Sequence, residues 1–287
     1  MSLRWKGWSL GLTTSGLLLV ALALVWLLVI FPIMAKMPAD YENEYMFEGS
    51  VQVLNPETMS MIEIPTSVER LLTATGIEGD DVLLMKQDIT FSPGEVLASI
   101  GLDLDSSEVY GLDRTTRENV SGYGDMDRSG QFTFPAGVEQ ETYSFWSSSA
   151  MTALPATFVS EETFQGITVY NFKIDSKDLP AGTMAGTDLP QTMDVLTEIK
   201  VEPVSGVPVY TASTTTMKAP LMPGATVPIF VNYMAFTSDT TNEMVDTASS
   251  ARNMILWASV YGFWIVIGLG AALTLGGVIM AARAKTD

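Results

Sequence analysis

The chain has 287 residues, a formal net charge of −18, and neither cysteine nor histidine. Without histidine it cannot build a Ser-His-Asp or Cys-His nucleophile system or a histidine-ligated zinc or iron site. Without cysteine an exported domain has no disulfides and depends on its hydrophobic core. Because an acidic surface repels phosphate backbones, we expect no nucleic-acid partner.

The first element is an apolar run of 26 residues, from Leu10 to Ala35, without a charged residue. About 20 apolar residues cross a bilayer core of about 30 Å, so the run predicts a transmembrane helix. It is longer than the h-region of a cleaved signal peptide, which spans about 7–15 residues. We therefore interpret residues 1–36 as a cytoplasmic tail and an uncleaved signal anchor.

Residues 37–239 predict a mainly β extracytoplasmic domain, either an antiparallel β-sandwich or a barrel-like fold. Period-2 alternation and β-branched or aromatic residues recur through it, with turns at Gln165-Gly166, Ser205-Gly206 and Pro223-Gly224. About ten short strands at close spacing are typical of such folds. The expected strands are 46–54, 82–91, 107–115, 130–135, 141–147, 156–163, 166–175, 195–203, 207–217 and 227–237.

Two segments of this domain predict other structure. Thr66 and Glu69 follow Pro65 in a capping-box pattern, and Gly76 would stop the short helix that this pattern begins. Residues 176–194 contain Pro, Gly and Thr without periodicity, which is typical of a surface loop.

The stretch from 139 to 172 holds the candidate ligand-binding residues. Alternation puts Tyr143 and Phe145 on one face of a strand and Trp146 on the other, and Tyr170 and Phe172 share a face nearby. Core packing is the default interpretation of these aromatics, and an apolar-ligand cavity is the alternative. The serines at 147–149 lack both a Gly-x-Ser-x-Gly elbow and a histidine base, so we predict no catalytic residue here.

One loop offers a candidate metal site. Asp125, Asp127 and Ser129 place oxygen side chains at alternate positions before Gly130, which resembles the first half of a calcium loop. The twelfth position is Ala136 in place of the bidentate glutamate, so an EF-hand is excluded. An ordinary acidic turn is the default interpretation, without a cofactor, and a calcium ion is the alternative.

A second apolar run of 29 residues, from Met254 to Ala282, also contains no charge. A capping-box pattern at Thr240 and Glu243 precedes it, followed by apolar residues at helical spacing. Residues 240–287 therefore predict one continuous helix that forms a second transmembrane span, followed by a cytoplasmic tail.

Basic residues predict the orientation, because they favour the cytoplasmic side of a span. Two precede the first span and two follow the second, whereas Lys36 and Arg252 lie at the opposite ends. Both termini are thus expected in the cytoplasm, and the acidic domain outside. The four basic residues at the expected cytoplasmic ends are Arg4, Lys6, Arg283 and Lys285.

Each span also carries small residues every four positions, a spacing that lets helix backbones approach closely. We predict a helix–helix contact at these residues, either between the two spans of one chain or between subunits of a homo-oligomer. The residues are Gly7, Gly11 and Ser15 in the first span, and Gly268, Ala272 and Gly276 in the second.

Five short segments in this order resemble the PorA-type porin family, whose members are actinobacterial and related envelope proteins with two terminal spans and a large outer domain. The segments are YGLDRTTREN (110–119), FTFPAG (132–137), ETYSFW (141–146), GITVYNF (166–172) and VEPVSGVPV (201–209). The resemblance implies a protein of the prokaryotic plasma membrane and, by the family name, a pore.

Three functions stay open at this point. The leading hypothesis is a non-enzymatic envelope protein that binds or relays an apolar or lipid ligand, or serves as an accessory subunit of an envelope complex. The alternative is an oligomeric, porin-like pore. Two apolar helices from one chain cannot enclose water, so a pore would need several subunits. An enzyme is the distant third.

Overall fold

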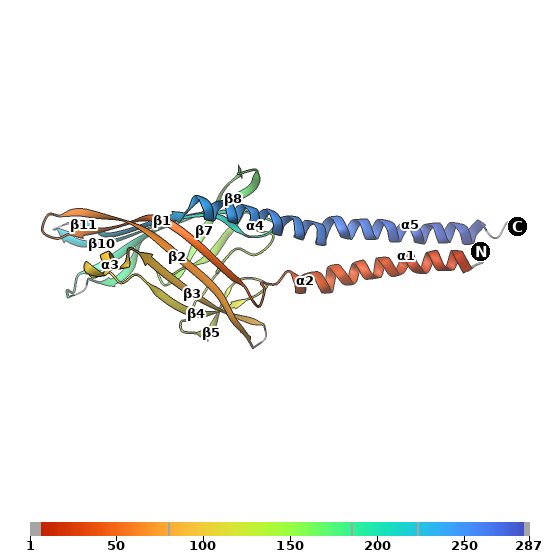
Figure 1. Cartoon of the computed structure of the whole chain (residues 1–287), viewed down its shortest axis with the longest axis horizontal. Helices are drawn as coiled ribbons and strands as arrows, with labels where there is room; N and C mark the ends of the chain where they lie inside the picture. The colour runs from red at the N-terminus through yellow and green to blue at the C-terminus, as the bar shows by residue number, and fades with distance from the viewer. Residues whose placement is uncertain (1–6, 80, 185, 223, 284–287) are drawn as a thin grey trace. The chain divides into compact units, whose positions relative to one another are not determined.

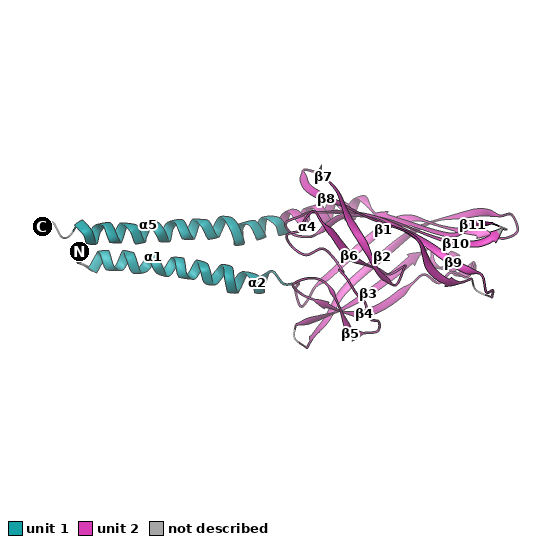
Figure 2. Ribbon diagram, turned by 180° about the vertical axis from the view of Figure 1, so that it is seen from behind, with its two compact units in different colours: residues 1–36, 251–287 teal, residues 37–250 magenta. Residues whose placement is uncertain are grey.

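The computed structural model describes residues 7–283 except residues 80, 185 and 223. The chain divides into two compact units (Figure 2). We call residues 1–36 and 251–287 the helix unit and residues 37–250 the sheet unit.

The helix unit is built from two apolar helical runs. The first run consists of α1 (Gly7–Val25), a π-helical turn (Trp26–Ile30) and α2 (Phe31–Met34). The second enters the unit from α4 (Ser238–Leu256) and continues through a π-helical turn (Trp257–Tyr261) into α5 (Gly262–Arg283), so that helical conformation is unbroken from Ser238 to Arg283. Both runs are long and apolar enough to cross a membrane.

Helices α1 and α5 pack against each other. The two π-helical turns also meet, because the indole Nε1–H of Trp26 donates a hydrogen bond to the carbonyl oxygen of Ala258 over 2.9 Å. Threonines along the helices satisfy their own hydroxyls within the helix, as Thr13 Oγ1 does on the Ser9 carbonyl (2.9 Å) and Thr274 Oγ1 on the Gly270 carbonyl (2.8 Å). Such bonds let polar side chains lie in an apolar helix at low cost.

The sheet unit contains one antiparallel sheet of eleven strands among the described residues (Figure 1). The order across the sheet is β5-β4-β3-β2-β1-β11-β10-β9-β8-β7-β6, so every neighbour except the β1–β11 pair follows directly in sequence. The strands are β1 (Glu42–Asn55), β2 (Ser60–Glu78), β3 (Val82–Ser92), β4 (Ser106–Asp113), β5 (Asn119–Gly124), β6 (Thr142–Ser147), β7 (Thr152–Phe164), β8 (Ile167–Thr183), β9 (Pro190–Val201), β10 (Pro208–Met222) and β11 (Ala225–Phe236).

The mainly β, antiparallel prediction is confirmed, but the sheet is open and does not form a closed barrel. Its two edge regions nevertheless hydrogen-bond to the same short segment, residues 130–132. On one side Asn119 N–H donates to the Gly130 carbonyl (2.8 Å), and on the other Trp146 N–H donates to the Gln131 carbonyl (3.0 Å). The two ends of the strand order are therefore linked through this segment.

The short helix predicted from Thr66 to Gly76 is wrong, because these residues lie within β2. Strand β2 pairs with β1 from Ser60 to Thr73 and with β3 from Ser67 to Glu78, with a register shift between Ala74 and Gly76. These long ladders outweigh a local capping preference of about 1 kcal/mol.

The predicted surface loop at 176–194 is mostly wrong as well. Strand β8 continues to Thr183 and β9 begins at Pro190, with register shifts where the Pro- and Gly-containing stretch interrupts the ladder. The strand predicted at 130–135 is reduced to isolated bridges at Gln131. A short helix, α3 (Gly94–Ser99), was not predicted.

Candidate functional site

The sheet unit contains a partly open cavity of about 530 Å³. Ligand sites in proteins occupy about 300–1,000 Å³, so the space is large enough for a small molecule. Successive inward positions of one strand line it, as in β11, where the lining residues are Phe230, Asn232, Met234 and Phe236. Because nine of the eleven strands contribute lining residues, the sheet must curve around this space.

A cluster of charged and polar side chains forms one part of the wall, at β2, β3 and β4. Gln87 is 1% exposed, and its Oε1 accepts hydrogen bonds from Arg70 Nε (3.0 Å), Arg70 Nη2 (2.6 Å) and the Tyr110 hydroxyl (3.3 Å). The Arg128 guanidinium lies 3.6 Å from the ring centroid of Tyr110 and pairs with the Glu108 carboxylate.

Burial dominates the electrostatics of this cluster. It lowers the pKa of the Arg128 guanidinium from its ordinary value, because desolvation disfavours the charged form, even though Tyr110 and Glu108 act in the opposite direction. Burial also raises the pKa of the Tyr110 hydroxyl. At neutral pH the tyrosine is therefore uncharged and its hydroxyl acts as a donor to Gln87.

Hydroxyl and apolar groups from β9, β10 and the loop after β6 line another part of the cavity. Thr197 and Ser213 share a hydrogen bond (2.9 Å), and Thr215 Oγ1 donates to Ser149 Oγ (3.2 Å). Further along these strands, Met193 and Met217 are paired across β9 and β10. The wall thus changes from hydroxyl-bearing to apolar along the strands.

The four predicted ligand-binding aromatics join one aromatic cluster around Phe134, a residue that we did not single out. The Phe134 ring centroid lies 4.5 Å from that of Phe172, 5.2 Å from Tyr143 and 5.1 Å from Phe145. Tyr170 reaches the cluster through Phe158, at 5.5 Å. Of the four, only Phe145 lines the cavity; Trp146, expected to point away from it, lines the cavity too.

Arg70 was missed as a cavity residue because residues 66–76 were predicted to be helical. In a strand, the alternation places the side chains of Val68, Arg70 and Leu72 on one face. Because Val68 and Leu72 are apolar and buried, Arg70 between them must point into the cavity as well. Arg128 carries no such signal, since it lies outside any strand.

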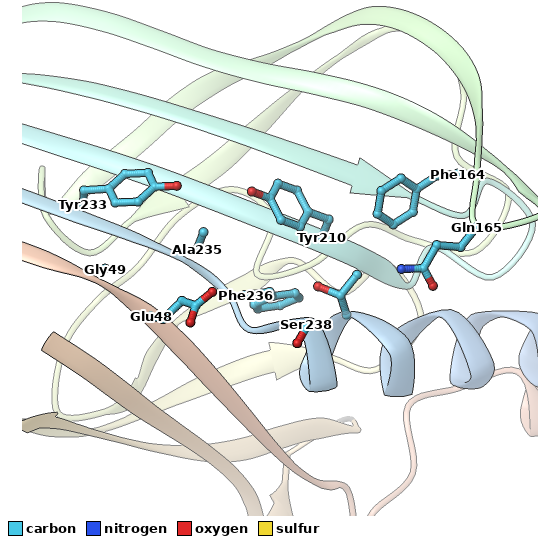
Figure 3. Close-up of a pocket in the computed structure, with 10 residues that line it drawn as sticks. Glu48, Gly49, Phe164, Gln165, Tyr210, Tyr233, Ala235, Phe236 and Ser238 are labelled. Atoms are coloured by element: carbon cyan, nitrogen blue, oxygen red, sulfur yellow. The ribbon is translucent and has the colours of Figure 1, made fainter. Parts of the chain in front are cut away.

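A second, smaller pocket of about 380 Å³ lies on the sheet unit near the start of α4 (Figure 3). The figure shows the rings of Tyr210 and Phe164 beside it, with Glu48 and Ser238 on the other side. Burial raises the pKa of the Tyr210 hydroxyl, with Tyr233 adding to the effect. With a single carboxylate in its lining, this pocket offers no paired groups for acid–base chemistry.

The predicted calcium residues have ordinary structural roles in their turn. Asp125 Oδ2 accepts a hydrogen bond from Val109 N–H (3.1 Å), and Asp127 Oδ1 accepts one from Gly122 N–H (2.7 Å). Ser129 is exposed. Over residues 7–283, apart from the three gaps, no group of three or more Asp, Glu, His or Cys side chains is arranged to hold a metal ion. The structure therefore gives the calcium prediction no support.

The predicted helix-contact residues do not form the contact between α1 and α5. A Cβ atom built at Gly7, Gly11, Gly268 or Gly276 would meet nothing within 4 Å, and Ser15 and Ala272 are exposed. The contact uses a neighbouring stripe instead. At Gly16 a Cβ would lie 2.3 Å from Thr274 Oγ1, and at Gly277 it would lie 2.2 Å from Thr13 Oγ1.

This difference has a simple geometric reason. Ala272 and Thr274 are two positions apart, about 200° around a helix, so they lie on opposite sides of α5. Each helix carries small residues on both sides, and spacing alone does not say which side meets the partner helix. The predicted residues remain available on the side away from the pair.

Fold and cavity together define a class: a protein with two apolar helices suited to a membrane and a β-domain curved around an internal cavity. The family model described as Porin PorA matches residues 8–279, nearly the whole chain, and the chain belongs to this family. The resemblance seen in the five sequence segments is thereby confirmed, and the protein is a membrane protein. A search of the curated proteins gave no match.

Proposed function

We propose that the protein acts as an oligomeric, porin-like pore in a prokaryotic plasma membrane, with both termini in the cytoplasm and the sheet unit outside. Family membership over residues 8–279 is the observation that supports this function best. A porin family also favours a non-enzymatic role. The basic residues proposed to set the orientation are Arg283, which the structure describes, and Arg4, Lys6 and Lys285, which lie outside the described residues.

The helix unit supports an oligomer for a physical reason. Two apolar helices cannot enclose a water-filled lumen, so helices from several copies must line it. In each copy the side of α5 that carries Gly268 and Ala272 is exposed, while the opposite side packs on α1. Small residues on an exposed side are suited to close approach between copies.

The test is conductance of the purified full chain in planar lipid bilayers, combined with subunit counting by native mass spectrometry. Wild-type protein should give discrete conductance steps and a homo-oligomer. Ala272→Ile adds bulk to the proposed contact and should lower both the oligomer fraction and the conductance at least tenfold. The matched control is Ala271→Ile, the same change about 100° around the helix at another exposed position.

If wild-type protein shows no conductance in any oligomeric state, the proposal that it forms a pore is wrong. An Ala272→Ile variant that conducts and assembles like Ala271→Ile would remove this face from the proposed contact.

A second candidate function is favoured by the cavity itself. A protein that binds or relays an apolar or lipid ligand, or presents one within an envelope complex, needs a cleft or cavity of this size. The cavity meets that requirement without any contribution from the helix unit, because all its lining residues belong to the sheet unit.

A further inference from the structure

The charge inside the cavity has the opposite sign to the charge of the protein. The chain as a whole carries 33 acidic and 15 basic residues, whereas the charged residues among the described lining are Arg70, Arg128 and Glu108. One carboxylate cannot neutralise two guanidinium groups, so the wall retains an excess of one positive charge. A cation that is partly removed from water without a paired anion is destabilising, and an anion placed beside it relieves that cost.

The two arginines differ in access. Arg70 is only partly buried and lines the cavity, so a bound anion can contact its guanidinium directly. Arg128 is 3% exposed, and its Nε has no hydrogen-bond partner in the described structure. A buried donor without a partner is unusual in native proteins and calls for an explanation such as a bound ligand or water.

Two more lining residues have the same property. Trp146 Nε1 and Asn232 Oδ1 are buried and also lack a hydrogen-bond partner. Trp146 is part of the arginine cluster, since the Arg128 guanidinium lies 5.6 Å from its ring centroid. Two unsatisfied donors, Arg128 Nε and Trp146 Nε1, therefore lie beside the excess positive charge, whereas the unsatisfied Asn232 Oδ1 belongs to β11.

The rest of the cavity is long and largely apolar. On β11 its lining runs from Phe236 to Phe230, six residues or about 20 Å along an extended strand. At the Phe230 end, β10 contributes Met217, which pairs in register with Phe230, and β9 contributes Met193, which pairs in register with Met217. Methionine side chains adapt their shape readily to flexible apolar ligands.

We propose that the cavity binds an anionic amphiphile, a single-chain molecule with a carboxylate or phosphate head and a long alkyl tail. The head contacts Arg70 beside Arg128, and the tail extends along β9, β10 and β11 toward Met193 and Phe230. This inference names the ligand class for the second candidate function and rests on that function. It does not depend on the pore.

The test is a titration of the detergent-extracted full chain, in a non-ionic detergent, followed by native mass spectrometry. The probes are palmitate and hexadecyl phosphate as anionic amphiphiles, hexadecanol as a neutral amphiphile of similar tail length, and inorganic phosphate as a head without a tail. Wild-type protein should retain one anionic amphiphile per chain, at least about tenfold more tightly than hexadecanol, because a hydrogen bond to a charged group contributes about 1.5–3 kcal/mol.

Two variants locate the site. Arg70→Gln should reduce the affinity for the anionic amphiphiles to that for hexadecanol. Its control is Lys86→Gln, the same loss of charge on the outward face of β3, where Lys86 pairs with Asp88 over 2.7 Å. Ser213→Trp fills the cavity without changing its charge and should abolish retention of all the amphiphiles, which keeps the test informative if Arg70→Gln fails to fold.

The outcomes separate the two levels of the proposal. A preference for either anionic head supports the inference. Equal retention of hexadecanol and palmitate by wild type overturns the anionic specificity but leaves ligand binding standing. If inorganic phosphate displaces palmitate and binding does not depend on the alkyl tail, the proposal that the ligand is an amphiphile is wrong. If no amphiphile is retained, both the inference and the second candidate function fail.

Discussion

The helix unit and the sheet unit pack in opposite ways, the first through small residues and the second through large side chains. In the helix unit small residues bring two backbones together, so that even one extra carbon at Gly16 or Gly277 would overlap the neighbouring helix. In the sheet unit large side chains such as Tyr110, Phe134 and Phe172 are almost fully buried, yet a cavity remains between the strands. Close approach leaves no room between α1 and α5 of one chain. The cavity is lined by residues of the curved sheet and its loops.

The largest effect is expected where the sheet itself uses close approach. A Cβ atom at Gly49 would lie 1.9 Å from the Tyr233 carbonyl oxygen, so Gly49→Ala must push β1 and β11 apart. We expect the free energy of unfolding of the sheet unit to fall by about 3 kcal/mol. Thermal unfolding followed by the strand band of the infrared amide I spectrum would measure it.

The matched control for that substitution is Gly76→Ala in β2, where the added carbon meets nothing within 4 Å. It should change stability by no more than about 0.5 kcal/mol. Equal losses in the two variants would show that backbone flexibility, and not the β1–β11 contact, sets the cost.

An intermediate loss of stability is expected in the helix unit, where substitutions at two adjacent glycines can be compared. Gly277→Ala places a carbon 2.2 Å from Thr13 Oγ1 and 2.7 Å from the Ser9 carbonyl, and should weaken the α1–α5 pair by about 2 kcal/mol. Gly276→Ala meets nothing and should instead favour the helix slightly. Unfolding by sodium dodecyl sulfate in mixed micelles compares them, and a loss in Gly276→Ala alone would contradict the contact seen here.

The smallest expected effect is on the pH dependence of stability, which should differ between the sheet unit and the helix unit. A hydrogen bond from Lys86, helped by Ser107, lowers the pKa of the Asp88 carboxyl below its ordinary value. Its contribution to sheet stability is therefore present above an unfolded-state pKa of about 3.9 and is lost as the pH falls through the lower folded-state value. Because the pair is partly exposed, Asp88→Asn should cost less than about 1 kcal/mol at pH 7.

The helix pair provides the internal reference for this prediction. The runs from Leu10 to Ala35 and from Met254 to Ala282 contain no ionisable acid or base apart from tyrosine, so acid should leave their pairing unchanged. Stability curves measured from pH 7 to about pH 2 on wild type and Asp88→Asn should approach each other as the pH falls through the folded-state pKa of Asp88. Curves that stay parallel would mean that Asp88 contributes through its shape and not its charge.

Much of the fold could be predicted from residues that act locally. Uncharged apolar runs identify the spans, and period-2 alternation identifies most strands. The Thr66–Glu69 pattern misled because a capping box is a preference of a few residues, whereas β2 is stabilised by ladders to β1 and β3 that no local window contains. The strands near 176–194 were missed because register shifts interrupt their alternation.

The cavity could not be predicted, because it depends on long-range register. Arg70 meets Gln87 across β2 and β3, and Arg128 reaches Tyr110 from a loop. Neither pairing has a sequence signature. The aromatics at 143–172 were recognisable as a cluster, but Tyr143, Phe145 and Phe172 pack around Phe134, which lies outside that stretch. Small residues on both sides of each span left the contact face undecided for the same reason.

The short segment at residues 130–132 has a consequence for how the sheet meets other molecules. An open sheet normally ends in strands whose unpaired N–H and C=O groups recruit strands from other molecules and seed aggregation. Here both edge regions direct backbone groups to the same three residues, through Gly130, Gln131 and Phe132. The segment thereby covers part of each edge, and we expect it to hinder the addition of strands from other molecules.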